Sequence, residues 1–375
     1  MSKKATHNLG KKLISVSLAA LMLFATLGTA LAAPAERYAS EFDSLMDVVA
    51  AEAALNKEIG AEGFVLLKNE GSNLPFVNVF NVSVFGKNSV NPVYSGSGSS
   101  GGTSGNTVSI IDSLEIAGLK VNPTLVEFYN DEAASGAVRP SMGFASYNYH
   151  SFFPTAETPQ SSYTEAVKAS YEEYKDAAII VFSRTGGEGT DLPRSSFVTE
   201  EFEGKVPPSD QARAFPTFED LLDGYTPYGG EGRTSDPYEH YLELDDNEEA
   251  LLEEVTSKFD KVVVILNSSN VMELGENITK NAKVQSVIWA PGAGQNGFYA
   301  LGRILTGKIN PSGRTTDTFI ADFTKDPAYQ NFANNNVGFY ADGTAGNQYM
   351  MEDGQLYADA HIGLSRAHSY KIGRA

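Results

Sequence analysis

The 375-residue sequence contains no cysteine. That absence excludes a disulfide framework, a thiolate nucleophile and a zinc site built on thiolates. Histidine is scarce as well, since the five histidines lie far apart and no two have the short spacing of a metal-binding pair. We therefore predict no metal site in this chain.

Basic residues are few compared with acidic ones. The chain has 28 Lys and Arg against 47 Asp and Glu, a net charge of −19, and the body of the chain holds no basic cluster. A surface this negative repels phosphate backbones, so we predict that nucleic acid is not a partner. Apolar residues make up 42% of the sequence, enough for a real core, and the length suits one large α/β domain.

The N-terminus has a composition of its own. Four lysines lie within the first twelve residues, an apolar run covers residues 13–31, and small residues follow at 30–34. This pattern predicts a secretory signal peptide over residues 1–32, cleaved after Ala32, and hence a secreted or cell-surface protein. The apolar run is also long enough for an uncleaved membrane anchor, which stays the alternative.

The rest of the chain alternates between short apolar runs and amphipathic stretches. Residues 33–60 show helical spacing and predict a helical lead-in. Predicted strands lie at residues 82–86, 120–121, 177–182, 262–266 and 284–289. Predicted helices lie between them, at residues 108–117, 125–134, 163–175 and from the N-cap Asp246 onward. Such alternation indicates a parallel sheet covered on both faces, interrupted by a long loop at 193–241.

One loop follows the predicted strand at 177–182. It places Glu188 between two glycines, with Arg184 before it and Asp191 after it. Open α/β sheets bind ligands at the carboxyl ends of their strands, so Glu188 is a candidate acid catalyst. Asp191 could supply a second carboxylate, and Arg184 could neutralise Asp191 and leave Glu188 protonated. An ordinary solvated, salt-bridged turn is the other interpretation of the same residues.

A second loop, residues 95–105, consists almost entirely of glycine and serine. Residues 96–101 match the dinucleotide pattern G-x-G-x-x-G, but they do not join a strand directly to a helix, so nucleotide binding has weak support. Serine hydroxyls and backbone amides suit a sugar equally well, which makes Ser97, Gly98 and Ser99 candidate substrate contacts. An inert flexible loop is the remaining alternative.

Several motifs resemble, in order, those of one known family, glycoside hydrolase family 3. They lie at residues 61–69 with 74–75, at 84–86 with 95–102, at 288–297 and at 307–314. They are similar to the second domain of that family, a six-stranded α/β sandwich. The resemblance implies the fold class: a three-layer, mostly parallel α/β domain over residues 61–320 with a long inserted loop.

The resemblance also implies a reaction, the retaining hydrolysis of a terminal β-linked sugar without a cofactor. Glu188 matches the family's general acid/base, and Ser97, Gly98, Ser99, Arg184 and Asp191 become the candidate contacts to a β-linked glycoside substrate. The family's nucleophile is an aspartate of a separate barrel domain, typically followed by tryptophan. The single tryptophan here, Trp289, follows Ile288, so this chain contains no matching nucleophile.

The end of the chain departs from the family pattern. Residues 349–357 begin like the segment that leads to the barrel in permuted members, but residues 358–375 do not align with it. We interpret residues 321–375 as a linker and an aberrant tail, and hypothesise a truncated or frame-shifted enzyme with little turnover of its own. The alternative is a non-catalytic carbohydrate-binding or assembly module that completes a barrel on another chain.

Overall fold

The computed structural model describes residues 41–96, 101–102, 107–139, 155–186 and 241–323, and the short strands β7 (Met351–Glu352) and β8 (Gln355–Leu356). The predicted signal peptide and nearly all of the predicted loop at 193–241 lie outside these residues. The chain divides into two compact units, Met1–Glu52 and Ala53–Ala375. Within the described residues, no helix has both the length and the apolar character that crossing a bilayer requires.

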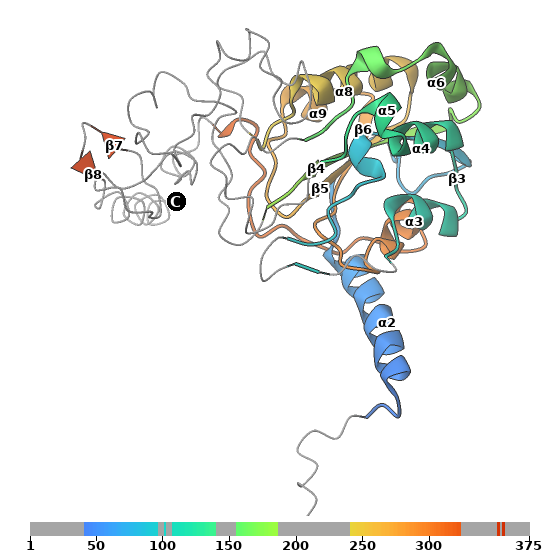
Figure 1. Cartoon of the computed structure of the whole chain (residues 1–375), viewed down its shortest axis with the longest axis vertical. Coiled ribbons are helices and arrows are strands. Elements are labelled where there is room, and N and C mark those ends of the chain that lie inside the picture. The colour runs from blue at the N-terminus through green and yellow to red at the C-terminus, as the bar shows by residue number, and fades with distance from the viewer. Residues whose placement is uncertain are drawn as a thin grey trace, which may run out of the picture. The chain divides into compact units, whose positions relative to one another are not determined.

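The second unit is built on a six-stranded sheet (Figure 1). Its strands, in spatial order, are β1 (Val65–Asn69), β6 (Val284–Trp289), β5 (Val262–Ser268), β4 (Ala177–Arg184), β2 (Asn81–Phe85) and β3 (Lys120–Val121). All neighbours pair in parallel except β1, which runs antiparallel to β6. The predicted six-stranded, mostly parallel sheet is therefore confirmed, with one antiparallel edge.

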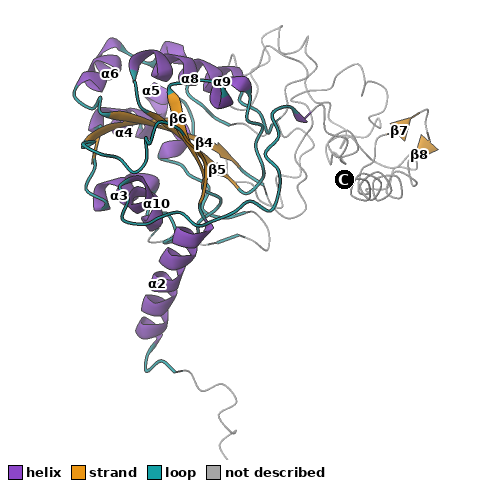
Figure 2. Ribbon diagram, turned by 180° about the vertical axis from the view of Figure 1, so that it is seen from behind, coloured by secondary structure: helices purple, strands orange, loops and turns teal. Residues whose placement is uncertain are grey.

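Helices cover both faces of this sheet (Figure 2). One face packs against α3 (Ile110–Ile116) and α10 (Tyr299–Leu305). The other face packs against α4 (Pro123–Asn130), α6 (Glu165–Ala169), α8 (Asp246–Lys258) and α9 (Glu276–Thr279). Helix α2 (Leu45–Gly63), the short α5 (Glu132–Ser135) and the 3₁₀ turns Lys87–Ser89, Gln160–Ser162 and Ser170–Glu172 complete the described elements.

The burial of both faces of the two central strands explains why the domain has three layers. Every residue of β4 and β5 is buried. Alternate side chains enter opposite cores, since Ile179 and Val181 belong to the α3/α10 side whereas Ile180 and Phe182 belong to the α8 side. Runs of β-branched residues favour a strand with two buried faces, and such a strand needs helices on both sides.

Three local predictions differ from the structure. The helix predicted over 125–134 is divided at Asp131, whose extended backbone ends α4 and whose side chain caps α5. The N-cap of α8 is Asp245 and not Asp246: its carboxylate accepts a hydrogen bond from the Glu248 amide, and the Glu248 side chain accepts one from the Asp245 amide. This capping box fixes the helix start one residue earlier. The helix predicted over 163–175 is the short α6 followed by a 3₁₀ turn, Ser170–Glu172.

Candidate active site

The sheet changes its direction of winding between β2 and β4. From β2 the chain moves outward to β3, whereas from β4 it moves the opposite way to β5 and then β6. Ligands of open α/β sheets bind outside the carboxyl ends of the strands at such a switch point. The register pairs Phe85, the last residue of β2, with Ile180, so β4 continues past the end of β2 to Arg184. The chain that leads to Glu188 therefore starts at this switch point.

Arg184 is completely buried at the end of β4. Its Nη1 donates to Oε1 of Glu248 at 2.7 Å, and its Nη2 donates to Oε2 at 2.5 Å. Nε and Nη2 also donate to the carbonyls of Tyr241 and Glu243. The strand end is thus attached to the start of α8 through a two-point ion pair and to the segment before α8 through two carbonyls.

The electrostatics of Arg184 agree with this geometry. Burial by itself lowers the pKa of the guanidinium, but the charge and hydrogen bonds of Glu248, together with the nearby Tyr241 and Asp245, outweigh it and raise the pKa above its usual value. The described contacts of Arg184, predicted as a substrate contact, are therefore internal ones. Asp191, its other predicted partner, lies outside the described residues.

The first residues of the Glu188 loop are held from both sides. The Thr185 amide donates to the Tyr241 hydroxyl at 2.9 Å. A Cβ placed on Gly186 would lie 2.7 Å from Oδ1 of Asn270, so only glycine fits there without movement of that side chain. The described chain ends at Gly186, and Glu188 itself lies outside the described residues.

The base of the Gly/Ser loop lies next to the turn after β6. The Gly294 amide donates to the Tyr94 carbonyl at 2.8 Å, and a Cβ on Gly292 would lie 3.0 Å from that same oxygen. The Gly102 amide donates to Oγ of Ser95 at 2.9 Å and brings the two ends of the loop together. The candidate contacts Ser97, Gly98 and Ser99 fall in this loop and lie outside the described residues.

A buried polar cluster lies behind the end of β2, and sequence reasoning missed it. The Lys87 amide donates to both carboxylate oxygens of Glu157 at 3.1 Å, and the Thr158 amide donates to Oε1 at 2.9 Å. Burial, and next the nearby Glu248 carboxylate, raises the pKa of Glu157 to about 8, against the effect of these amide donors. Glu157 thus keeps its proton under conditions where an exposed glutamate has lost it.

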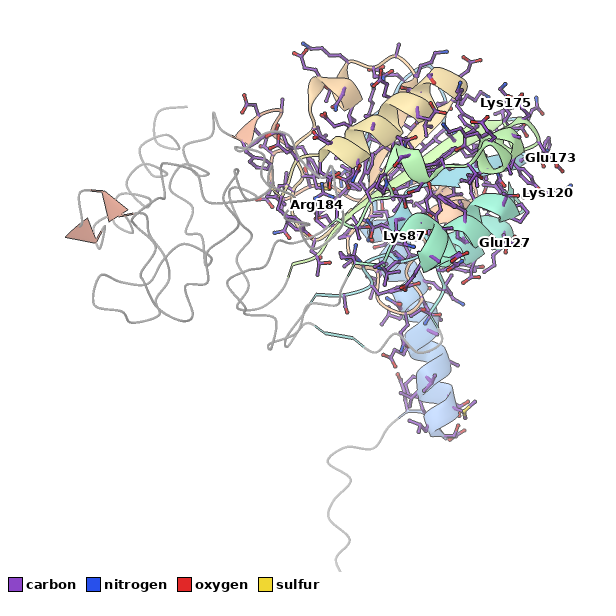
Figure 3. The ribbon with its side chains drawn as sticks, turned by 45° about the horizontal axis from the view of Figure 1, so that its top comes forward. Lys87, Lys120, Glu127, Glu173, Lys175 and Arg184 are labelled. Carbon is purple, nitrogen blue, oxygen red and sulfur yellow. The ribbon has the colours of Figure 1, made fainter. Side chains whose placement is uncertain are left out.

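The Lys87 side chain is part of the same cluster. Its Nζ donates to the Tyr129 carbonyl at 2.6 Å and to Oγ of Ser135 at 2.7 Å, and burial lowers its pKa. In Figure 3, Lys87 and Arg184 lie at one end of the sheet, and Lys120 and Lys175 lie toward the other. The only sequence signal for this buried lysine was its place directly after a buried strand and Gly86.

Asn267, at the end of β5, is a second residue that sequence reasoning did not single out as functional. Its side chain bonds to the base of the Gly/Ser loop, to β4 and to the residue after β6. The signal in the sequence was an asparagine directly after the apolar run at 262–266. Among the described residues, no group of His, Cys, Asp and Glu could hold a metal ion.

Comparison with known proteins identifies the family. The family model described as "Glycosyl hydrolase family 3 C-terminal domain" matches residues 64–362. The chain belongs to the glycosyl hydrolase family 3 C-terminal domain family. The match starts at Phe64, directly after α2, and includes the complete sheet of the second unit.

Two curated relatives of this family 3 chain carry the name beta-glucosidase. The one from Ruminococcus albus is 27% identical over 286 residues, which are 76% of this chain and 25% of the relative. Beta-glucosidase A from Butyrivibrio fibrisolvens is 28% identical over 278 residues, 74% of this chain and 30% of the relative. The family 3 chain therefore spans less than a third of the length of either relative.

Solved structures agree on the fold. The chain resembles beta-glucosidase 3B from Thermotoga neapolitana, solved in complex with glucose, with a TM-score of 0.52 and 23% identity over 75% of this chain and 33% of that one. It also resembles a beta-glucosidase from Paenibacillus barengoltzii, with a TM-score of 0.51 and 23% identity over 76% of this chain and 26% of that one. At this identity the likeness establishes the α/β sandwich.

Proposed function

We propose that this family 3 domain supplies the general acid/base of a β-glucosidase-like hydrolase, and that Glu188 is that residue. The observation that carries the proposal is the fixed end of β4. Arg184 is clamped to Glu248, and Thr185 is bonded to Tyr241, at the switch point where open α/β sheets bind ligands. Glu188 follows within four residues of this anchor.

Glu188 acts twice in the proposed reaction. It first protonates the oxygen of the departing group and then, as a carboxylate, removes a proton from the water that completes hydrolysis. The substrate is a β-linked oligosaccharide or glycoside, bound with the help of Ser97, Gly98, Ser99 and Asp191. The names of the two curated relatives support this substrate class.

The second carboxyl group of the reaction comes from a barrel domain. Retaining glycosidases place their two carboxyl groups about 5 Å apart, so the barrel must approach the carboxyl edge of this sheet closely. The family resemblance assigns the nucleophile to an aspartate of that barrel, either in the same polypeptide or on a partner chain. The predicted signal peptide supports a secreted or surface-held site of action.

Hydrolysis of an aryl β-glucoside by the 375-residue chain, measured together with a family 3 barrel domain, tests the proposal, because the proposed nucleophile belongs to that barrel. Any turnover must fall at least a hundredfold in Glu188→Gln, because the amide cannot give up or accept the catalytic proton. The matched control is Glu172→Gln, an exposed glutamate whose side chain is 74% accessible, which leaves turnover unchanged. Turnover that survives Glu188→Gln contradicts the assignment.

A second candidate function is a carbohydrate-binding or assembly module without turnover of its own. It is favoured by one observation: the family model that matches residues 64–362 is that of the C-terminal domain, whereas the proposed nucleophile belongs to a different domain. Calorimetric titration with glucose separates the two candidates. Binding of glucose without hydrolysis of the aryl glucoside supports the module, and hydrolysis that depends on Glu188 supports the enzyme.

A further inference from the structure

The side chain of Asn267 uses all of its hydrogen-bonding capacity. Its Oδ1 accepts from the Val93 amide at 2.6 Å and from Oγ of Ser183 at 2.9 Å. Its Nδ2 donates to the Val93 carbonyl at 3.0 Å and to the Ala290 carbonyl at 3.0 Å. A carboxamide has two donor hydrogens and two acceptor lone pairs, and here all four have partners.

These partners belong to three separate segments of the carboxyl edge. Val93 lies at the base of the Gly/Ser loop, Ser183 lies on β4 just before the Glu188 loop, and Ala290 begins the turn after β6. Asn267 and Ser183 are fully buried, as is Ala290. Water cannot replace a lost bond at such a site without entering the core, so each bond restrains the segment that makes it.

Only a carboxamide can make this set of bonds. Val93 presents both an amide donor and a carbonyl acceptor. The side chain of Asn267 forms a hydrogen bond with each, as the backbone of a neighbouring strand would. In a rotated amide Nδ2 would face the Val93 N–H, and Oδ1 would face the carbonyl oxygens of Val93 and Ala290. The partners themselves therefore fix the orientation of the side chain. A carboxylate has no donor for the two carbonyls.

We propose that Asn267 is a positioning residue that holds residues 93–96, residues 183–186 and residues 290–294 in one relative arrangement. The three segments meet in this one side chain, and residues 93–96 also meet residues 290–294 through the bond from the Gly294 amide to the Tyr94 carbonyl. The consequence for catalysis rests on the proposed role of Glu188, because misplacement of a catalytic group by about 1 Å costs on the order of a hundredfold in rate.

Hydrogen–deuterium exchange of the full chain with Asn267→Asp tests the inference. This substitution preserves the shape of the side chain and replaces its two donors by a carboxylate that faces two carbonyls. We expect exchange to rise at least fivefold in residues 93–96 and 290–294 at neutral pH, with the amides of β2 and the first half of β5 unchanged. Ser183→Ala is the matched control: it removes one of the four bonds and loosens residues 183–186 alone.

The pH dependence of exchange in Asn267→Asp distinguishes lost hydrogen bonds from lost packing, because a loss of packing would not depend on pH. In acid, the introduced carboxyl group becomes protonated and regains one donor, so protection of residues 93–96 or 290–294 returns toward that of the wild type at the same pH. Unchanged exchange at neutral pH, or a rise spread evenly over the whole sheet, overturns the proposal. If Asn267→Asp does not fold at neutral pH, folding recovered in acid supports the inference and failure to fold at both pH values overturns it.

Catalysis is measured separately. Where the wild-type chain hydrolyses an aryl β-glucoside, Asn267→Asp lowers kcat at least tenfold and Ser183→Ala lowers it less. An Asn267→Asp chain with full kcat and loosened segments overturns the catalytic part of the inference. Where the wild-type chain shows no hydrolysis even with a barrel domain present, the proposed function fails, and the exchange experiment still decides the role of Asn267.

Discussion

Arg184 and Glu248 form a completely buried ion pair in which Nη1 lies 2.7 Å from Oε1 and Nη2 lies 2.5 Å from Oε2. The pair joins the last residue of β4 to the first turn of α8. Three further bonds, from Arg184 to the carbonyls of Ser183, Tyr241 and Glu243, use the remaining donors of the guanidinium. Glu248 also closes the capping box of α8, so one carboxylate serves both the helix start and the strand end.

Removing only one member of this pair should be costly. We expect Arg184→Met to lower the free energy of unfolding by about 3–5 kcal/mol, because it leaves the Glu248 carboxylate buried without its cation. The double variant Arg184→Met/Glu248→Leu should recover much of that loss, since no charge stays unpaired. Urea denaturation measures both. The exposed pair Lys175–Glu172 is the matched control, and Lys175→Met should cost less than about 1 kcal/mol.

Glu157 makes stability depend on pH. Its pKa is about 8 in the folded chain and near 4.5 in the unfolded chain, so between these values the folded state binds the extra proton. The contribution of Glu157 to stability is complete below about pH 4.5 and is lost as the pH rises toward 8. We expect the wild type to lose about 1.4 kcal/mol per pH unit more than Glu157→Gln across this window.

Urea denaturation at pH 5, 6, 7 and 8 checks this expectation for the wild type, for Glu157→Gln and for the exposed control Glu172→Gln. The control must keep the slope of the wild type. Parallel curves for the wild type and Glu157→Gln would mean that Glu157 is already ionised in the folded chain, held by the amides of Lys87 and Thr158.

The parallel part of the sheet followed from local sequence. Apolar runs such as 177–182 and 262–266 are long enough and β-branched enough to identify buried strands, and the helical stretches between them require parallel pairing. The antiparallel edge was not predicted from the residues. It depends on Val65 pairing with Trp289, two residues far apart in the sequence, and nothing local to either indicates the direction of that pairing.

The candidate site was predictable only in part. Glu188 was singled out because glycines flank it after a recognisable strand, and its role stays a prediction. Glu157 was missed because it lies in a stretch rich in aromatics, serine and proline, and because its hydrogen-bond donor, the amide of Lys87, comes from a distant segment. Asn267 was missed for the same reason, since its four bonds reach three segments that only the folded sheet brings together.

Gly302 of α10 should be intolerant of any side chain. A Cβ at this position would lie 2.2 Å from the carbonyl oxygen of Ser113, which is part of α3, and 2.9 Å from Cβ of Ala117, the C-cap of α3. We expect Gly302→Ala to lower the free energy of unfolding by about 1–3 kcal/mol through overpacking, measured by thermal denaturation. Gly63, with no atom within 4 Å of its Cβ position, is the control, and Gly63→Ala should be neutral or stabilising by up to about 1 kcal/mol.

Tyr241→Phe should loosen the start of the Glu188 loop with little effect elsewhere. The Thr185 amide donates to the Tyr241 hydroxyl at 2.9 Å, and both groups are buried, so losing the acceptor leaves an unsatisfied N–H that costs about 1–3 kcal/mol. The ring of Tyr241 remains in place against the Arg184 guanidinium, 5.3 Å from its centroid. Amide exchange at Thr185 and Gly186 should therefore rise at least tenfold.

The matched control makes the same chemical change at the neighbouring strand end. In Tyr129→Phe, the lost hydroxyl is the acceptor of the Gly86 amide at 2.9 Å and the partner of the Tyr163 hydroxyl at 2.7 Å. This variant should raise exchange at Gly86 and Lys87 and leave Thr185 protected. An equal rise of exchange at both strand ends in either variant would show that the two loops open together as one unit. The Tyr241 hydroxyl would then not restrain the chain that leads to Glu188 independently of the other loop.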